Sequence, residues 1–155
     1  MNFIQWNMET DGKMSGKMVK MDIYPGYYGD ENFSEIMLVG EDMILPIYVT
    51  RWQAESIMSG VEGETPGRPM THDVFIKVIN AMGGSIKKVV IDELHGGVFM
   101  AKLYIERYRD KKAEEIVMDT RPSDCIALAA REGCDIYVSE EVLLEAGRSK
   151  EEAGI

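Results

Sequence analysis

The sequence contains no apolar run that approaches the ~18 residues a membrane-spanning helix needs. It also lacks a Gly-rich phosphate loop, a dinucleotide fingerprint and a Gly-x-Ser-x-Gly nucleophile elbow, so the commonest nucleotide-binding and serine-hydrolase signatures are absent. The N-terminus has no basic start followed by an apolar block, and we therefore expect no signal peptide. Together these absences predict a cytoplasmic protein with no membrane contact.

Cysteine and basic residues are also scarce. Cys125 and Cys134 are nine positions apart, a spacing that matches no zinc or redox motif. Their apolar surroundings predict reduced core thiols. The 17 Lys and Arg residues are outnumbered by 27 Asp and Glu, which gives a formal net charge of −10. This charge argues against nucleic-acid binding by bulk electrostatics, so any contact with RNA or DNA should be weak and local.

The 155 residues, 45% of them hydrophobic, suit one globular domain with a single core. Hairpin and helix patterns follow one another without an internal repeat. They predict an α+β fold with a mixed or antiparallel sheet, hairpins and about four helices. We expect residues 1–16 to be a loose N-terminal segment, residues 17–147 to be the domain, and residues 148–155 to be a C-terminal tail.

Two amphipathic helices are expected in the middle of the chain. The first follows Thr50 as its N-cap, and the second begins near Thr71 and ends at Gly83-Gly84. A β-hairpin that turns near residues 95–97 should follow the second helix. The apolar residues at helical spacing predict the buried stripes. These are Ala54, Ile57, Met58 and Val61 in the first helix, and Val74, Phe75, Val78, Ile79 and Met82 in the second.

The stretch RPMTHDV, at the start of the second helix, has a structural and a functional interpretation. In the structural one, Thr71 caps the helix and Asp73 occupies its positive first turn, four residues before Lys77. In the functional one, the helix N-terminus and Arg68 bind an anion. His72 would then act as an acid, a base or a ligand.

The stretch DTRPSD, between a predicted strand and an apolar helix, has the same two interpretations. Pro122 suits the first helical position, Ser123 and Asp124 suit the first turn, and Arg121 would pair with Asp119 or Asp124. Alternatively, Asp119 and Asp124 hold a divalent metal, and Arg121 binds a phosphate in bidentate fashion. Carboxylates, a metal and a cation are what phosphodiester hydrolysis requires.

Four segments in this order resemble the bifunctional nuclease domain family, formerly a domain of unknown function, in its bacterial single-domain form. They are LPIYV from Leu45, RPMTHD from Arg68, DTRPSDCIALA from Asp119 and IYVSEEV from Ile136. The likeness covers residues 17–147. It implies an α+β domain, a homo-oligomer with a dimer favoured, and nuclease activity on RNA, DNA or both. Eight polar residues stand at the motif positions: Arg68, Thr71, His72, Asp73, Asp119, Arg121, Ser123 and Asp124.

We therefore predict that the two helix N-termini converge into one pocket. The catalytic candidates are His72, Asp73, Asp119 and Asp124, and the substrate-binding candidates are Arg68, Thr71, Arg121 and Ser123. Mg²⁺ or Mn²⁺ at Asp119 and Asp124 is the expected cofactor, with no organic cofactor. The alternative is that the same residues form a structural polar network in a non-catalytic module that binds an anion or a protein.

Overall fold

The computed structural model of the chain describes residues 16–64 and 66–155, and these form eight strands and five helices. The first four strands are β1 (Met18–Gly29), β2 (Ser34–Val39), β3 (Met43–Val49) and β4 (Gly84–His95). The last four strands are β5 (Val98–Arg109), β6 (Lys112–Thr120), β7 (Asp135–Ser139) and β8 (Arg148–Ser149). The helices are α2 (Arg51–Glu62), α3 (Thr71–Ala81), α4 (Pro122–Glu132), α5 (Glu140–Ala146) and α6 (Lys150–Ala153).

All eight strands belong to one mixed sheet of order β6-β5-β4-β7-β1-β2-β3-β8. Strands β4 and β7 pair in parallel, and the other neighbouring pairs are antiparallel. The expected hairpin joins β4 to β5, and Gly96 and Gly97 take positive φ angles of 56° and 80° at its turn. The predicted single α+β domain with a mixed sheet is confirmed.

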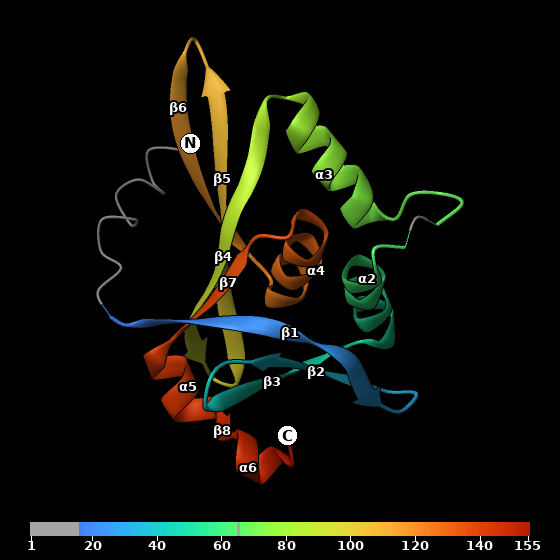
Figure 1. The fold of residues 1–155 in the computed structure, drawn as a ribbon, viewed down its shortest axis with the longest axis vertical. Coiled ribbons are helices and arrows are strands. Elements are labelled where there is room, and N and C mark those ends of the chain that lie inside the picture. Colours follow the sequence, from blue (N-terminus) through green and yellow to red (C-terminus); the bar gives the residue numbers. More distant parts are fainter. Residues whose placement is uncertain (1–15, 65) are drawn as a thin grey trace.

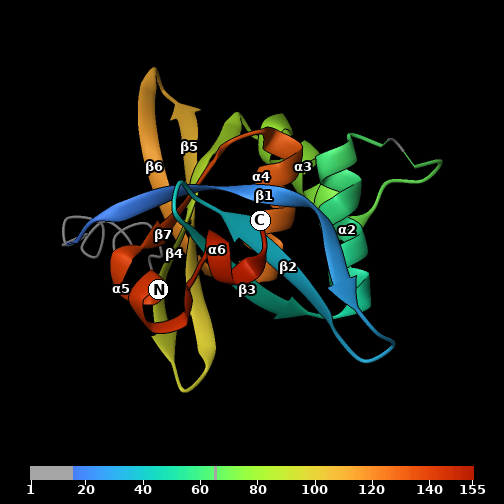
Figure 2. The ribbon, with the colours of Figure 1, turned by 60° about the horizontal axis from the view of Figure 1, so that its bottom comes forward.

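Strand β1 joins the two halves of the sheet. Its first part, Met18 to Met21, pairs with β7, and its second part, Asp22 to Gly29, pairs with β2. The pairing shifts register between Ile23 and Tyr27, around Pro25 and Gly26. Figures 1 and 2 show β1 crossing the molecule from the β4–β7 side to the β2–β3 side.

Helices α2, α3 and α4 pack beside one another against the sheet, with α4 over β4, β5 and β7 and α2 over β1 and β2 (Figure 1). The main core lies between these helices and the sheet. Thr50 caps α2 as predicted, because its side chain accepts from the N–H of Gln53 while the Gln53 side chain accepts from the N–H of Thr50. Ala54, Ile57 and Met58 are buried, as expected.

Helix α3 departs from two expectations. Met70 occupies the N-cap position and Thr71 is the first helical residue, so Thr71 does not cap the helix. The predicted buried stripe was also wrong, because no residue of α3 is buried. Ile76 and Ile79 pack partly against the core. The other four residues of the predicted stripe, Val74, Phe75, Val78 and Met82, are exposed.

The last part of the chain is ordered into elements. Ser139 caps α5, and its hydroxyl accepts from the N–H of Val142. Residues 148–155, expected as a tail, contain β8, which pairs with β3, and the short helix α6. The expectation for residues 1–16 falls almost wholly outside the described residues. Within the described part of the chain, no helix is long and apolar enough to span a membrane.

Candidate functional site

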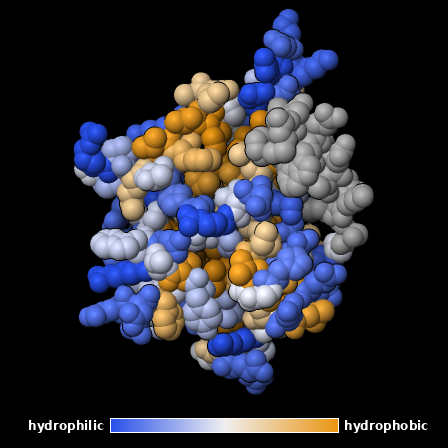
Figure 3. Space-filling model, turned by 180° about the vertical axis from the view of Figure 1, so that it is seen from behind, coloured by the Kyte–Doolittle hydropathy of each residue, from blue (hydrophilic) through white to orange (hydrophobic). Residues whose placement is uncertain are grey.

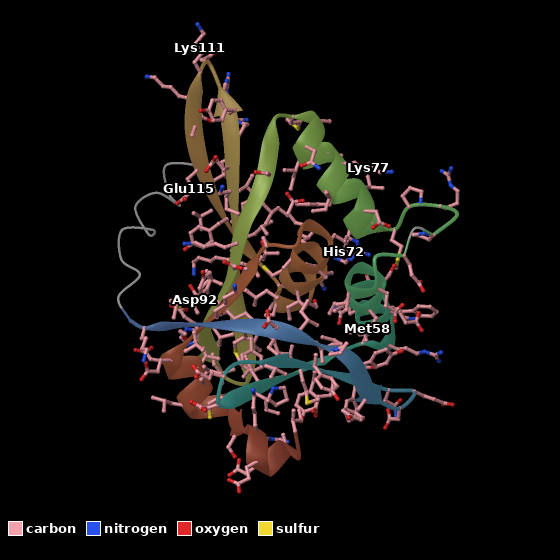
Figure 4. All side chains as sticks on the ribbon, in the orientation of Figure 1. Met58, His72, Lys77, Asp92, Lys111 and Glu115 are labelled. Carbon is pink, nitrogen blue, oxygen red and sulfur yellow. The ribbon has the colours of Figure 1, made fainter. Side chains whose placement is uncertain are left out.

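His72 lies where α2, α3 and α4 meet (Figure 4). It is the second residue of α3, so its side chain reaches across the N-terminus of that helix. Asp124 lies in the first turn of α4, after Arg121 at the N-cap and Pro122 at the first helical position. The contact between His72 and Asp124 brings two helix N-termini together, as predicted.

A chain of hydrogen bonds runs from a buried serine to the surface through His72. Ser56 Oγ lies 2.7 Å from His72 Nδ1, and His72 Nε2 lies 2.9 Å from Asp124 Oδ1. Arg121 Nε then donates to Asp124 Oδ2 at 2.9 Å. Ser56 is only 4% exposed, whereas the Arg121 side chain is 71% exposed. The site is therefore anchored in the interior by α2 and opens to solvent at Arg121.

The partners of His72 determine where its proton lies. The Asp124 carboxylate can only accept, so Nε2 carries a hydrogen and donates to it. In the neutral ring, Nδ1 accepts from the hydroxyl of Ser56. That hydroxyl can turn toward Nδ1 because its oxygen accepts from Arg131 Nη2 at 3.3 Å. The arrangement has the partners of a Ser-His-Asp triad, but here the buried serine contacts the Nδ1 side and the carboxylate contacts Nε2.

Two opposing effects act on Asp124. Its burial alone would raise the pKa of the carboxyl. The hydrogen bonds from His72 and Arg121, with the positive charge of Arg121, outweigh that effect and hold the pKa below its ordinary value. Asp124 is therefore an ionised carboxylate at neutral pH, suited to orient the imidazole of His72.

Arg131, near the C-terminal end of α4, locks the three helices beneath this site. Its side chain is 7% exposed. The guanidinium donates from Nε to Asp73 Oδ1 at 2.7 Å, and from Nη1 to the carbonyl oxygens of Ser56 at 3.0 Å and Ala127 at 2.9 Å. One side chain thus holds α3 through Asp73 and α2 through Ser56.

Both carboxylate oxygens of Asp73 are bonded to protein groups that hold helix α3 in place. Its Oδ1 accepts from Arg131 and its Oδ2 accepts from the N–H of Met70 at 2.8 Å. The hydrogen bond from Arg131, followed by that from Met70, lowers the pKa of this carboxyl. The expected partner Lys77 contributes only a weaker, longer-range charge effect. Asp73 therefore joins α3 to α4, and both of its oxygens are occupied.

A surface pocket of about 310 Å³ opens over the hydrogen-bonded chain. Thr71, His72, Arg121 and Asp124 line it together with residues of α2 and Met70. Trp52, at the start of α2, forms one wall and is 76% exposed. The lining of the pocket thus combines two helix N-termini, an arginine, an imidazole and an aromatic ring.

Asp119 is not part of this pocket. On β6, Val117 contacts Tyr104 and Val90 on the sheet face opposite the helices, and Asp119, two residues later, shares that face. The ladder with β5 is regular here and pairs Asp119 with Lys102. Asp119 and Asp124 therefore lie on opposite faces of the sheet, and the structure does not bring them together to share a metal ion.

The remaining candidates take different positions. Thr71 is exposed and borders the pocket. Ser123 is buried in the first turn of α4. Arg68 is exposed in the loop before α3 and is not among the residues that line the pocket. Of the eight sequence candidates, four line it: Thr71, His72, Arg121 and Asp124.

Sequence reasoning missed Ser56, Arg131 and Trp52. Ser56 looked like an ordinary polar residue within a helix, and Arg131 looked like a cation that suits a helix C-terminus. The only available signal was the position of Arg131 on the same helix as Asp124, two turns later. No sequence pattern placed Trp52 beside His72, because α2 and α3 meet only through the tertiary fold.

The His, Asp and Glu side chains near the pocket are not arranged as the ligands of a metal ion. Among residues 16–64 and 66–155, no group of three or more His, Cys, Asp or Glu side chains is arranged to hold one. Both Asp124 oxygens accept from protein groups, and Asp119 lies on the other sheet face. The predicted Asp119 and Asp124 metal pair does not fit this geometry.

The sequence model of one protein family, described as the bifunctional nuclease domain, matches residues 36–151 of this chain. The chain belongs to the bifunctional nuclease domain family. The matched range includes α2, α3 and α4, and so contains every residue of the pocket and of the Arg131 contacts. Strand β1 precedes it.

Relatives within this family include proteins named as bifunctional nucleases. An uncharacterized protein of Mycobacterium tuberculosis is 41% identical over 106 residues, which cover 68% of this chain and 60% of that protein. Bifunctional nuclease 2 of Oryza sativa is 30% identical over 115 residues, covering 74% of this chain and 35% of the plant protein. Bifunctional nuclease 2 of Arabidopsis thaliana is 27% identical, with 74% and 35% covered. The chain thus spans 60% of the length of the mycobacterial relative and about a third of the length of the plant relatives.

Proposed function

We propose that this protein hydrolyses phosphodiester bonds of RNA, DNA or both at the pocket formed by α2, α3 and α4. The observation that carries the proposal is the His72–Asp124 contact, which sets two helix N-termini, an imidazole and an exposed arginine around one opening. The names of the plant relatives support the same class of reaction.

Phosphate recognition would use groups that are already directed at the pocket. The first-turn N–H groups of α3 and α4 have no partners within their own helices and favour an anion. The bond from Arg121 to Asp124 uses Nε–H, so the Nη groups can donate to phosphate oxygens. Trp52 offers an aromatic face on which an unpaired base can stack. These contacts are few, in keeping with weak binding by a protein of net charge −10.

Hydrolysis requires a proton to leave the attacking water and a proton to reach the leaving oxygen. The water oxygen forms a new bond to phosphorus as the P–O ester bond breaks. His72 would take up the water proton at Nδ1, the ring nitrogen that carries no hydrogen, once the Ser56 hydroxyl turns away from it, and would pass a proton from there to the leaving oxygen. Asp124 would keep the other hydrogen on Nε2 and hold the ring in place. Arg121 would offset the charge that develops on the phosphate oxygens.

Dependence on Mg²⁺ or Mn²⁺ remains a prediction. Magnesium ions in nucleotide-processing sites are commonly held by one or two carboxylates together with substrate phosphates. Asp124 is the carboxylate at the pocket that could take part if its bonds to His72 and Arg121 rearranged. A cleavage assay in Mg²⁺, in Mn²⁺ and in EDTA tests this dependence. The cytoplasmic location also remains a prediction.

A non-catalytic role is the second candidate, and one observation favours it. The side-chain nitrogens of His72 and both oxygens of Asp73 and Asp124 have protein partners. A polar network satisfied in this way would fix three helices together without reacting. The pocket would then bind a small anion or a segment of another protein.

The deciding experiment is a cleavage assay on highly purified protein with labelled single-stranded RNA and DNA, in Mg²⁺, in Mn²⁺ and in EDTA. His72→Ala and Arg121→Ala are compared with two control variants, His95→Ala and Arg109→Ala. His95 is an exposed histidine bonded to Glu93, and Arg109 is exposed at the far β5–β6 turn. We expect the pocket variants to lose cleavage at least about 100-fold, as for a lost acid–base group. The control variants should match the wild type.

Two results would count against catalysis. Cleavage that persists equally in His72→Ala and His95→Ala would identify a contaminant. Absence of cleavage under every condition, with His72→Ala losing stability, would favour the structural network. Phosphate or oligonucleotide binding that is lost in Arg121→Ala alone would then support an anion-binding module.

A further inference from the structure

Three exposed aromatic side chains gather at one end of strands β1, β2 and β3. Tyr28, Phe33 and Tyr48 are between 48% and 61% exposed, and none of them lines the pocket around His72. The turn between β1 and β2 lies at the outer edge of the molecule in Figures 1 and 2. Large apolar or aromatic groups that are exposed together commonly mark an interaction site.

Tyr28, Glu35 and Tyr48 stand side by side across these strands. The register pairs Tyr28 with Glu35 and Glu35 with Tyr48, so the three side chains lie on the same face of the sheet. The adjacent pair, Ile36 and Ile47, is buried in the main core between the sheet and the helices. Successive residues of a strand alternate between the two faces, so the three side chains face away from α2, α3 and α4. We call Tyr28, Glu35 and Tyr48 the aromatic ladder.

Glu35, in the middle of the aromatic ladder, is a carboxylate without a partner. Its side chain is partly buried between the two tyrosines. Within residues 16–64 and 66–155, it forms neither an ion pair nor a side-chain hydrogen bond. Arg51, the first basic residue that follows it in the sequence, is bonded to Glu55 on α2 at 3.0 Å. A charge that is partly removed from water is unfavourable without a counter-charge, so the ladder is suited to accept a cation.

The segment that contains the aromatic ladder carries only acidic charge. Residues 21–50 include six acidic residues and no Lys, Arg or His. Asp30 and Glu31 are exposed in the β1–β2 turn, close to Tyr28 in the sequence. In the view from behind, the lower left of the molecule, on the side of this turn, is mostly polar, whereas apolar residues gather in the upper part (Figure 3). The ladder is therefore an aromatic surface in acidic surroundings.

The β1–β2 turn holds Phe33 against the aromatic ladder. Asp30 Oδ1 accepts from the backbone N–H of Asn32 at 2.7 Å and from that of Phe33 at 3.2 Å. The N–H of Asp30 donates to the carbonyl of Phe33 at 3.0 Å. The ring of Phe33 meets Tyr48 edge-on, with 5.7 Å between the ring centroids and 74° between the planes. The aromatic surface is thus preformed, which lowers the entropy cost of binding.

We propose that the aromatic ladder binds an arginine side chain of a partner protein segment. The guanidinium would stack on the rings of Tyr28 and Tyr48 and donate hydrogen bonds to Glu35. Neighbouring strands lie about 4.8 Å apart, so roughly 9.6 Å separates the Cα atoms of the two tyrosines. A flat cation in contact with both rings needs about 7–8 Å between them, which a small inward tilt of the rings provides. Other basic residues of the segment would face Asp30 and Glu31.

Charge and shape select a basic segment over other partners. Acidic surroundings repel the phosphates of nucleic acid and disfavour a second copy of a chain with net charge −10. A purely apolar partner would bury Glu35 without a counter-charge. Arginine suits the ladder better than lysine, because its planar, weakly hydrated guanidinium stacks on aromatic rings and bonds a carboxylate through two parallel donors. The proposal does not depend on the proposed hydrolysis, since the ladder is not part of the pocket.

Fluorescence anisotropy at physiological salt tests the proposal with the full chain. The probe is a short labelled peptide of Gly, Ser and Arg residues. The comparison peptide has citrulline, which is uncharged but similar in shape, in place of each arginine. We expect the wild type to bind the arginine peptide at least about 10-fold more tightly than the citrulline peptide. Equal binding of the two peptides would overturn the proposal, and so would argininamide that competes as strongly as the unlabelled peptide, because the site would then serve a small cation.

Variants of the aromatic ladder separate this site from the general negative charge of the protein. Glu35→Gln should weaken binding at least about 10-fold, and Tyr28→Ala about 3–10-fold. The matched controls are Glu41→Gln, with the same loss of charge at the exposed β2–β3 turn, and Tyr108→Ala, which removes an exposed tyrosine on β5. Both controls should bind like the wild type. If Glu35→Gln and Glu41→Gln have the same affinity, only bulk charge attracts the peptide and the proposal fails.

Photo-cross-linking locates the site in the unmodified protein, without any risk that a substitution disturbs the fold. Trypsin, which cuts after Lys and Arg, releases residues 21–51 as one fragment, because no basic residue lies between Lys20 and Arg51. A peptide with a benzophenone group beside its arginine should become attached to this fragment. Attachment to the fragment that carries His72 instead would place the peptide at the pocket and overturn the proposal.

Discussion

Replacement of Arg131 by methionine tests whether one buried cation holds the three helices together. Methionine keeps the length and apolar contacts of the side chain and removes the guanidinium. Asp73 then loses its ion pair, and the carbonyl oxygens of Ser56 and Ala127 lose their donors. The variant therefore leaves a carboxylate and two carbonyl groups without their partners near the core.

The size of the loss follows from burial. Removing one partner of a fully buried ion pair costs about 3–5 kcal/mol. The side chain of Asp73 is 22% exposed and keeps its bond from Met70, so water offsets part of the penalty. We expect Arg131→Met to lower the free energy of unfolding by about 3 kcal/mol. The control Arg51→Met, which breaks an exposed pair with Glu55, should cost about 0.3–0.5 kcal/mol.

Urea unfolding at pH 7 and fixed protein concentration measures both variants. A loss of about 3 kcal/mol should lower the midpoint by at least about 1 M, given ordinary denaturant slopes. A double-mutant cycle with Asp73→Asn should give a coupling energy of at least about 1.5 kcal/mol. If Arg131→Met falls within 1 kcal/mol or so of Arg51→Met, or shows no coupling to Asp73, the reasoning about the buried cation is refuted.

The same pair predicts a direction with pH. The folded pKa of Asp73 is lowered from its ordinary value of 3.8, so its contribution to stability is present above that value and is lost as the pH falls through the folded pKa. The stability gap between wild type and Arg131→Met should therefore be constant near neutral pH and narrow below about pH 4. A gap that widens in acid would contradict the assignment.

Three further predictions concern other parts of the molecule. Trp52→Ala should weaken binding of single-stranded oligonucleotides by about 1–3 kcal/mol per stacked base and leave duplex binding unchanged, as measured by fluorescence anisotropy; equal effects on both would exclude stacking. Gly60→Ala should destabilise the protein in thermal unfolding despite better helix propensity, because the new Cβ would lie 2.9 Å from Cβ of Ala130; a gain in stability would mean that α2 and α4 separate easily. Cys125 and Cys134 should react with a thiol reagent at pH 8 only after unfolding, since burial raises both pKa values; rapid reaction in the native state would contradict their placement.

The sequence was informative where local chemistry decides the outcome. The Thr50 cap, Pro122 at the first position of α4 and the Gly96-Gly97 turn depend on a few adjacent residues, and all three were predicted correctly. The convergence of His72 and Asp124 came from motif positions in a recognised family. Local chemistry alone could not have given that contact, because the two residues are 52 positions apart.

Features that depend on the packing of distant segments could not be predicted. Asp119 and Asp124 are five positions apart, but β6 ends between them. Asp119 therefore lies on one face of the sheet, and Asp124 lies on helix α4 over the other face. The apolar pattern of α3 predicted the helix correctly, but the prediction that its apolar residues are buried was wrong, because their burial depends on which other segments pack against the helix. Ser56 and Arg131 gained their roles only when α2 and α4 came into contact.

Strand β1 bears on how this protein can be shortened. Its two parts are the only hydrogen-bonded connection, within the described residues, between the β6-β5-β4-β7 ladder and the β2-β3-β8 ladder. The region of family similarity starts at residue 36, after this strand. A chain trimmed to that boundary would expose two unpaired strand edges, on β7 and on what remains of β2, and would be prone to edge-to-edge aggregation. Any truncation meant to preserve the pocket should therefore begin before Met18.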